Sequence, residues 1–250
     1  MIVNRDHTVR GPYTAFAEVA EAYERGRPSY PDDAVRWLVG EQSCDVVDLG
    51  AGTGKLTRRL VAQGHRVVAV EPLDEMRAEL EAAVPGVHAV AGSAETIPLE
   101  DASADAVTSA QAFHWFDHDA ALPEIARVLR SVGRIALVWN CRDDRDPWMA
   151  RLSAIIGNET VEESYVVPIL DASGLFGPVE TARFSFAETR DRAGLLDLVL
   201  SRSYLAKLTP VERQPVLDAV GALYDETADA VGVRLAYVTE CFRARTKGAT

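Results

Sequence analysis

Of the 250 residues of this chain, 48% are hydrophobic, which is enough to bury a sizeable core. The formal net charge is −12 and there is no basic run, which argues against a nucleic acid as the main partner. No apolar run approaches a membrane span, no signal peptide opens the chain, and three cysteines without C-x-x-C spacing argue against a metal cluster or a disulfide framework. We therefore expect a cytoplasmic protein without a metal site, a membrane contact or a nucleic-acid partner.

The first 140 residues alternate between short apolar runs and helical patterns. The runs that predict strands are "CDVVDL", "RVVAVE", "GVHAVAG", "ADAVTSA" and "GRIALVWN". Helical patterns follow Gly54, cover residues 74–83 and cover about residues 119–130. The runs "VVAV" and "IALVW" are apolar throughout, as in strands covered on both faces. This alternation predicts an α/β fold with a doubly wound, mostly parallel, Rossmann-like sheet.

After Asn140 the pattern changes. Residues 147–157 predict a short helix, "PVETARFSFAET" predicts a strand, residues 191–228 are helical in character, and "RLAYVTECF" predicts the last strand. Helices between two late strands indicate a helical cap on the sheet rather than an independent domain.

The most informative stretch is the glycine loop "VVDLGAGTG", residues 46–54. A P-loop needs Ser or Thr after Gly-Lys, but Leu56 follows Lys55; a dinucleotide fingerprint needs its third glycine where Lys55 stands. Asp48, two residues before Gly50, would face a pyrophosphate unfavourably and suits a ligand that carries a cation. Glu71 ends the second strand, where an acidic side chain can accept both hydroxyls of a ribose. A ribose with a positive group and no phosphate describes S-adenosylmethionine.

At these residues the sequence resembles the class I S-adenosylmethionine-dependent methyltransferases. The resemblance covers about residues 15–145 and rests on "VVDLGAGTG", "VVAVEP", "GSAETIPL", "AQAFHWFD" and "EIARVLRSVGRIALVWN" in that order. An N-terminal F-x-x-x-A-x-x-Y-x-x-x-R-P-x-Y-P segment, residues 16–31, is similar to a bacterial subgroup that includes small-molecule methyltransferases.

The resemblance implies one domain, residues 1–250, with four parts. These are an N-terminal helical lid segment (1–40), a cofactor-binding core (41–143), a substrate-side helical cap (144–232), and a last strand and tail (233–250).

The resemblance also implies a set of cofactor contacts. Asp48 and the Gly50–Gly52 backbone should hold the methionine ammonium, and Glu71 should take the ribose. Ser93, Ala94 and Glu95 should lie near the adenine, with Gln111 at the amino-acid end. The full expected set is Tyr23, Arg27, Asp48, Gly50, Ala51, Gly52, Glu71, Pro72, Ser93, Ala94, Glu95 and Gln111.

Two positions depart from the family pattern. Ser93 stands where the family often has Asp, which weakens the acceptor for the adenine amino group. Ser131-Val132-Gly133 replaces Pro-Gly-Gly, although Gly133 preserves the turn.

For the substrate side we expect His114, Trp115 and Asn140, with His114 as the catalytic candidate. The segment around His114 follows the fourth strand, and ligands of open α/β sheets sit beyond the carboxyl ends of the strands. His114 could be a general base for a hydroxyl or amine acceptor, or a hydrogen-bond donor for a carboxylate. The alternative is that His114 and Trp115 merely pack beneath the cap.

The favoured function is methyl transfer from S-adenosylmethionine to a small molecule, directed to oxygen or to a carboxyl group. The alternatives are a nicotinamide-dependent oxidoreductase and a non-catalytic cofactor-binding protein. The sequence gives no basis for naming the acceptor or the oligomeric state.

Overall fold

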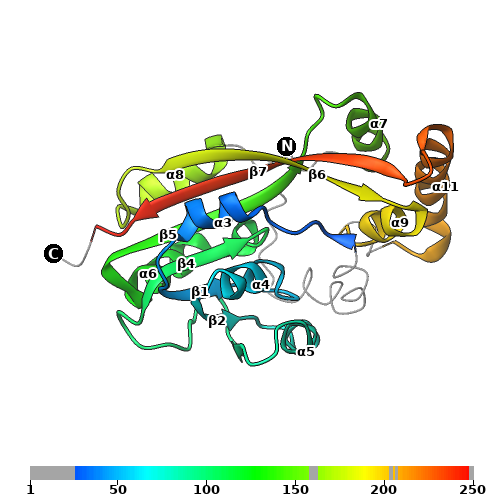
Figure 1. Ribbon diagram of the computed structural model, residues 1–250. Helices are drawn as coiled ribbons and strands as arrows, with labels where there is room; N and C mark the ends of the chain where they lie inside the picture. The colour runs from blue at the N-terminus through cyan, green and yellow to red at the C-terminus, as the bar shows by residue number, and fades with distance from the viewer. Residues whose placement is uncertain (1–25, 158–162, 203–204, 206–207, 248–250) are drawn as a thin grey trace.

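The structure, a computed structural model, describes residues 26–157, 163–202, 205 and 208–247. Its centre is one seven-stranded sheet in the order β3-β2-β1-β4-β5-β7-β6 (Figure 1). The strands are β1 (Asp45–Leu49), β2 (Arg66–Val70), β3 (His88–Val90), β4 (Ala104–Ala110), β5 (Leu129–Arg142), β6 (Glu180–Arg190) and β7 (Val233–Arg245).

The first five strands are parallel, whereas β7 runs antiparallel to both of its neighbours, β5 and β6. The sequence prediction of a doubly wound, mostly parallel α/β sheet is therefore confirmed. The carboxyl ends of β1 and β4 lie side by side, since Val47 and Asp48 pair with Val107 and Thr108.

Helices cover both faces of this sheet. On one face, α3 (Asp32–Val39) and α4 (Lys55–Ala62) pack on side chains such as Val46, Ala106 and Val138. On the other face lie α6 (His118–Val128) and α8 (Glu163–Ser173). Helix α5 (Asp74–Ala83) follows β2 and approaches the glycine loop through Leu80. Coverage on both faces explains why the runs "VVAV" of β2 and "IALVW" of β5 are apolar throughout.

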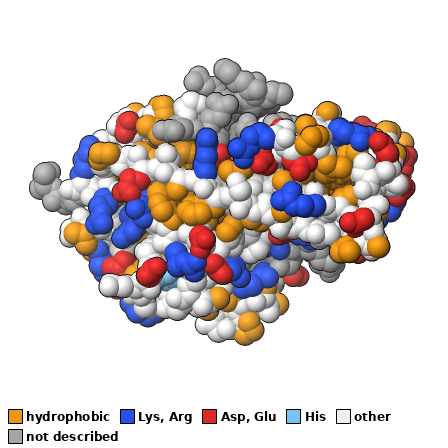
Figure 2. Space-filling view, turned by 45° about the horizontal axis from the view of Figure 1, so that its top comes forward, with side chains coloured by type: hydrophobic (Ala, Val, Ile, Leu, Met, Phe, Trp, Pro, Cys, Tyr) orange, Lys and Arg blue, Asp and Glu red, His pale blue; other side chains and the backbone are white. Residues whose placement is uncertain are grey.

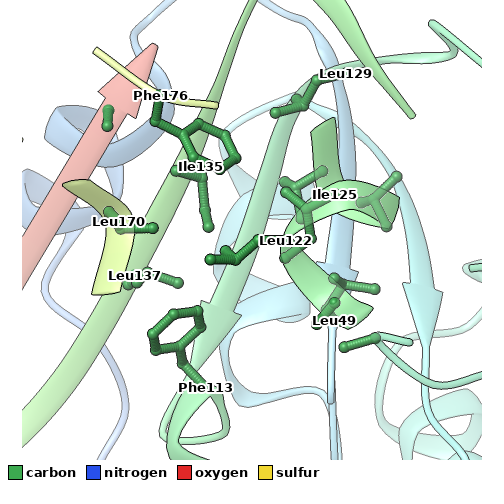
Figure 3. Close-up of a cluster of buried hydrophobic side chains, with 14 of the residues drawn as sticks. Leu49, Phe113, Leu122, Ile125, Leu129, Ile135, Leu137, Leu170 and Phe176 are labelled. Carbon is green, nitrogen blue, oxygen red and sulfur yellow. The ribbon is translucent and has the colours of Figure 1, made fainter. Parts of the chain in front are cut away.

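The α6 face shows how sequence periodicity becomes packing. Leu122 and Ile125 lie on the buried stripe of α6, and Figure 3 shows them beside Ile135 and Leu137 of β5. Phe113, from the short 3-10 helix η1 (Phe113–Trp115), joins the same buried cluster. This packing anchors the segment after β4 that carries His114 and Trp115.

Among the described residues, three further helices form the cap beyond the carboxyl end of β5: α7 (Pro147–Ile156), α9 (Arg192–Leu200) and α11 (Pro210–Thr227). Their starts follow local capping rules: Asp146 and Asp191 accept backbone N–H groups at the starts of α7 and α9, and Thr209 with Glu212 forms a capping box on α11. The helices share an apolar cluster with the ends of β6 and β7, so the cap extends the sheet's own core.

Several boundaries differ from the sequence expectations. Strand β5 begins at Leu129, directly after α6, because Leu129 pairs with Ala104 before a register shift brings in Arg134. Helix α8 was not expected, and Pro168 inside it explains why its pattern is obscure. The predicted strand within residues 144–232 is the edge strand β6, so this region contributes to the sheet as well as to the cap.

On the face in Figure 2, basic and acidic side chains are interspersed. Within the described ranges, no helix is both long and apolar enough to cross a membrane, and no group of three or more His, Cys, Asp or Glu side chains is arranged to hold a metal ion.

Candidate functional site

The glycine loop between β1 and α4 needs glycine for two separate reasons. Gly50, Gly52 and Gly54 have φ values of +63°, +56° and +82°, a backbone region that disfavours other residues. A Cβ on Gly50 would also lie 2.7 Å from Cβ of Ala112, and one on Gly54 would lie 2.9 Å from Cγ of Leu80. A side chain at Gly50 or Gly54 would therefore strain the backbone and also push the loop away from the segment after β4 or from α5.

Glu71 closes this loop from the neighbouring strand. Its Oε2 accepts the backbone N–H of Gly52 at 2.9 Å, and its Oε1 accepts that of Leu73 at 3.1 Å. The side chain is buried, and burial raises the pKa of its carboxyl group above the ordinary value. Each carboxylate oxygen can accept more than one hydrogen bond, so capacity remains for ligand hydroxyls.

Asp48 lies beneath the loop rather than beside it. Its Oδ2 accepts the hydroxyl of Thr57 at 2.6 Å and its Oδ1 accepts that of Thr108 at 2.9 Å. It is 1% exposed, and burial raises the pKa of its carboxyl group to about 6. Asp48 lines neither of the two cavities described below, and each of its oxygens accepts one threonine hydroxyl, so its contact with an ammonium group stays a prediction.

The first cavity opens above the ends of β1, β2 and β4 and has about 740 Å³, counting the space that opens to solvent. Nine of the sequence-predicted residues line it: Gly50, Gly52, Glu71, Pro72, Ser93, Ala94, Glu95, Gln111 and Trp115. The sequence reasoning missed five others: Leu73, Met76, Ala110, Ala112 and Phe116. Glu71 thus stands in a wall that is otherwise largely apolar.

A second cavity of about 400 Å³ adjoins the first, since Gly50, Gly52, Ala110 and Gln111 line both. It contains the predicted residues Arg27, Ala51 and Asn140, together with Pro28, Tyr30, Lys55 and Leu56, which the sequence reasoning had not assigned to the site. The lining includes two cationic side chains, Arg27 and Lys55. Lys55 begins α4 directly after the glycine loop, and this position in the chain could have predicted that it lies at the site.

Gln111 stands where the two cavities meet. Its φ of +57° is strained for a residue with a side chain, and such strain often marks functional positions. Its backbone N–H donates to O of Val138 at 3.0 Å, and its Nε2 donates to O of Asn140 at 3.1 Å. These bonds hold the segment after β4 against the end of β5.

Asn140 fastens the N-terminal segment to the sheet. Its Nδ2 donates to O of Ser29 at 3.1 Å, while its Oδ1 accepts the hydroxyl of Thr239 at 2.7 Å. Asn140 therefore lies at the site as expected, but its amide binds protein groups on both sides. Tyr23 lies outside the described residues.

Glu95 connects two edges of the first cavity. Its Oε1 accepts the backbone N–H of Asp117 at 2.9 Å, and the Asp117 side chain accepts that of Asp119 at the start of α6. The loop that carries Ser93 to Glu95 is thereby tied to the η1–α6 junction.

His114 and Trp115 occupy different places. Trp115 lines the first cavity, whereas His114 is exposed and lines neither cavity. The two rings lie 4.8 Å apart between centroids, and Nδ1 of His114 accepts the indole N–H of Trp139 at 3.5 Å. His114 is therefore at the rim of the site.

A Rossmann-like sheet with a glycine turn after β1, an acidic side chain after β2 and a shared cavity above them is the arrangement expected of a class I S-adenosylmethionine-dependent methyltransferase. A family model described as a methyltransferase domain matches residues 47–137. An uncharacterised methyltransferase of Mycobacterium tuberculosis is 45% identical over 236 residues, which cover 92% of this chain and 95% of that protein. The chain therefore belongs to this methyltransferase family.

Two further similarities are more limited. A candidate type II methyltransferase from Anaeromyxobacter dehalogenans has a similar structure, with a TM-score of 0.57 and 26% identity, covering 89% of this chain and 97% of that chain. A malonyl-[acyl-carrier protein] O-methyltransferase of Methylococcus capsulatus is 38% identical over 104 residues, which cover 39% of this chain and 38% of that protein.

Proposed function

We propose that the protein binds S-adenosylmethionine in the two adjoining cavities and transfers its methyl group to an oxygen of a small-molecule acceptor. The observation that carries the cofactor assignment is the placement of Glu71 in an apolar wall beside the glycine loop. A buried carboxylate there suits ribose hydroxyls, whereas it would repel a phosphate.

The lining residues fit the parts of this cofactor in order. Leu73, Met76 and Phe116 supply apolar surface for a purine, with Ser93 and Glu95 as polar groups. Gln111 and the Gly50–Gly52 backbone stand where the cavities meet, with Arg27 and Lys55 in the second cavity for a carboxylate. A Cβ built on Gly52 would have no neighbour within 4 Å, so the loop presents open space to a ligand at this point.

Asp48 serves the ligand ammonium through its charge and by holding the loop. Its two threonine partners fix the carboxylate beneath residues 50–52. A negative charge in this buried position favours a cation nearby, without requiring a direct hydrogen bond.

The bound cofactor would supply an electrophilic methyl group, and the chain's own residues would position the acceptor and exclude water. Proximity and desolvation supply much of the rate in a displacement of this kind. Trp115 lines the cavity and can present its ring face to a cation. We assign orientation of the acceptor to His114 at the rim.

The preference for an oxygen or carboxyl acceptor has one support beyond the sequence pattern. The similar protein of Methylococcus capsulatus is named as an O-methyltransferase, although the similarity covers 39% of this chain. We propose the cytoplasm as the site of action, and a small molecule as the partner, on the sequence pattern.

Intrinsic fluorescence tests the cofactor assignment, because Trp115 lines the first cavity. S-adenosylhomocysteine should change the emission in a saturable way, and NADH should not. A Trp115→Phe variant should lose most of this signal while calorimetry still detects binding. Saturation by NADH alone would overturn the proposal and favour an oxidoreductase. Transfer of a labelled methyl group to a metabolite extract then tests catalysis, and its absence would favour a non-catalytic cofactor-binding protein.

A further inference from the structure

The imidazole of His114 is held by a buried neighbour. The indole N–H of Trp139 donates to Nδ1 of His114 at 3.5 Å. Trp139 is 1% exposed, and its ring packs edge-to-face against Phe113 and Phe242, with centroids 6.4 and 5.8 Å away. Aromatic packing on two sides fixes the direction of this N–H, and losing its acceptor would leave a buried donor unsatisfied.

This contact determines where His114 carries its proton. A neutral imidazole has one protonated and one unprotonated nitrogen, and only the unprotonated nitrogen can accept a hydrogen bond. Because Nδ1 accepts from Trp139, the proton of neutral His114 lies on Nε2. The nitrogen that could act as a base therefore faces the protein core.

We propose that Trp139 is a positioning residue that holds His114 as an Nε2–H donor, so that His114 orients an acceptor that arrives as a carboxylate and removes no proton from it. This inference rests on the proposed function, and it assigns the class of acceptor. His114 lies outside both cavity linings but beside Trp115, which lines the first cavity, so we place the acceptor at the edge of that cavity.

The remaining polar groups of the site point to the same acceptor. No histidine is among the described residues that line the two cavities. The two carboxylates in the linings, Glu71 and Glu95, lie at the ribose and the adenine of the proposed cofactor. A carboxylate acceptor needs no base, whereas an alcohol would need one beside it.

The chemistry balances without proton transfer. An oxygen of the acceptor carboxylate forms a bond to the methyl carbon while the bond between that carbon and the cofactor sulfur breaks. The electron pair of the broken bond stays on sulfur and neutralises its positive charge. The products are a methyl ester and a neutral thioether, and no proton is gained or lost.

The tautomer can be read in the protein without cofactor or substrate. Nitrogen-15 NMR of protein labelled at histidine distinguishes protonated from unprotonated ring nitrogens, and a His114→Gln variant identifies the His114 signals. At a pH at which the His114 ring is neutral, we expect its proton on Nε2. In Trp139→Phe, which keeps an aromatic ring, we expect a mixture of the two tautomers. A wild-type His114 with its proton on Nδ1 would overturn the inference.

Because Trp139→Phe changes a buried ring, a second pair of variants tests the role of His114 itself at an exposed position. In His114→Ala the loss of a hydrogen bond to a charged acceptor should slow methyl transfer roughly ten- to a hundredfold. In His114→Gln the side-chain amide can donate in place of Nε2–H, so this variant should recover much of the loss. Equal rates in the two variants would overturn the donor role.

The product class completes the test. Labelled S-adenosylmethionine and a metabolite extract should yield a product that releases labelled methanol in mild alkali, as methyl esters do. An alkali-stable product would overturn the carboxylate inference and leave the proposed methyltransferase function intact. A protein that fails to bind S-adenosylhomocysteine would instead defeat the proposed function, whereas the NMR result would still stand for the Trp139–His114 pair.

Discussion

The backbone N–H of Gly52 donates to Oε2 of Glu71 at 2.9 Å, although 19 residues separate the two in the chain. The bond joins the turn after β1 to the end of β2, and Glu71 also accepts the N–H of Leu73. Both residues line the first cavity. Glu71 is therefore held in its binding position by the same loop that it stabilises.

Replacing Glu71 by alanine should weaken cofactor binding. Two ribose hydroxyls would lose a charged acceptor, and the Gly52 N–H would lose its partner. Hydrogen bonds to charged groups contribute about 1.5–3 kcal/mol, so the affinity for S-adenosylhomocysteine should fall roughly ten- to a hundredfold. Isothermal titration calorimetry measures this change.

Glu81→Ala is the matched control, because Glu81 is an exposed glutamate at the other end of α5. Its affinity for S-adenosylhomocysteine should equal that of the wild type. An unchanged affinity in a folded Glu71→Ala variant would remove Glu71 from the cofactor site.

The raised pKa of Asp48 predicts that the stability of the protein depends on pH. Burial raises the pKa of its carboxyl group from 3.8 to about 6, so the folded protein holds this proton more tightly than the unfolded chain does. The resulting stabilisation is complete below pH about 4 and is lost as the pH rises to about 6. By linkage the difference is roughly 3 kcal/mol. Asp48→Asn, neutral at every pH, should gain up to this amount over the wild type above pH 6.

The same substitution should weaken cofactor binding, since the charge near the ligand ammonium disappears. Stability and affinity should thus change in opposite directions. Denaturant unfolding and calorimetry at pH 4, 6 and 8 measure both. Asp171→Asn, at an exposed position of α8, should show neither effect. Equal S-adenosylhomocysteine affinity in Asp48→Asn would mean that the carboxylate only holds the loop.

The parts of the fold that sequence could predict are those set by local pattern. The apolar runs of β1, β2 and β4, and the turn at Gly50, follow from side-chain periodicity and from backbone freedom. The ends of β5 could not be predicted in this way, because Leu129 and Arg142 are in the strand through pairing with Ala104 and Tyr237. Those partners are distant in the chain.

Sequence could likewise place some residues of the candidate site but not others. Glu71 and Ser93 could be placed because they follow strands at fixed spacing, and ends of parallel strands converge. Met76 could not, since a helix face turned to a cavity has the same pattern as one turned to the core. Phe116 could not either, because it follows the short helix η1 in extended backbone, where no periodic pattern places a side chain. The direction of the Asp48 carboxylate depended on hydroxyls from α4 and β4, which no local pattern contains.

Gly50→Ala should destabilise the protein and abolish cofactor binding. The left-handed backbone at φ +63° alone costs a residue with a side chain about 1–3 kcal/mol. The new Cβ would also collide with Ala112 at 2.7 Å and push apart the two segments that line the cavity. Gly64 also has a positive φ, +86°, but a Cβ there would have no neighbour within 4 Å. The loss of unfolding free energy in Gly64→Ala therefore measures the cost of the backbone conformation alone. Equal losses of unfolding free energy in the two variants would contradict the steric argument.

The N-terminal segment before α3 lies across the site. The Ser29 N–H donates to Oε1 of Glu188 at 3.4 Å, and Nη2 of Arg27 donates to O of Ser201 at 3.3 Å. With the bond from Asn140 to Ser29, these contacts fasten residues 26–31 to the sheet and the cap. Arg27, Pro28 and Tyr30 at the same time line the second cavity. We infer that this segment closes over the cofactor.

Cofactor binding should therefore slow hydrogen exchange in this segment. With S-adenosylhomocysteine bound, the backbone amides of residues 26, 27, 29 and 30 should exchange more slowly, because opening the segment would break ligand contacts. Asn140→Ala should speed their exchange in the free protein and weaken binding severalfold, since one anchoring hydrogen bond contributes about 0.5–1.5 kcal/mol. Glu240→Gln is the control, because Glu240 pairs with Arg183 on β6 and takes no part in these contacts. Identical exchange rates with and without S-adenosylhomocysteine would mean that the segment is a fixed wall of the site, not a lid.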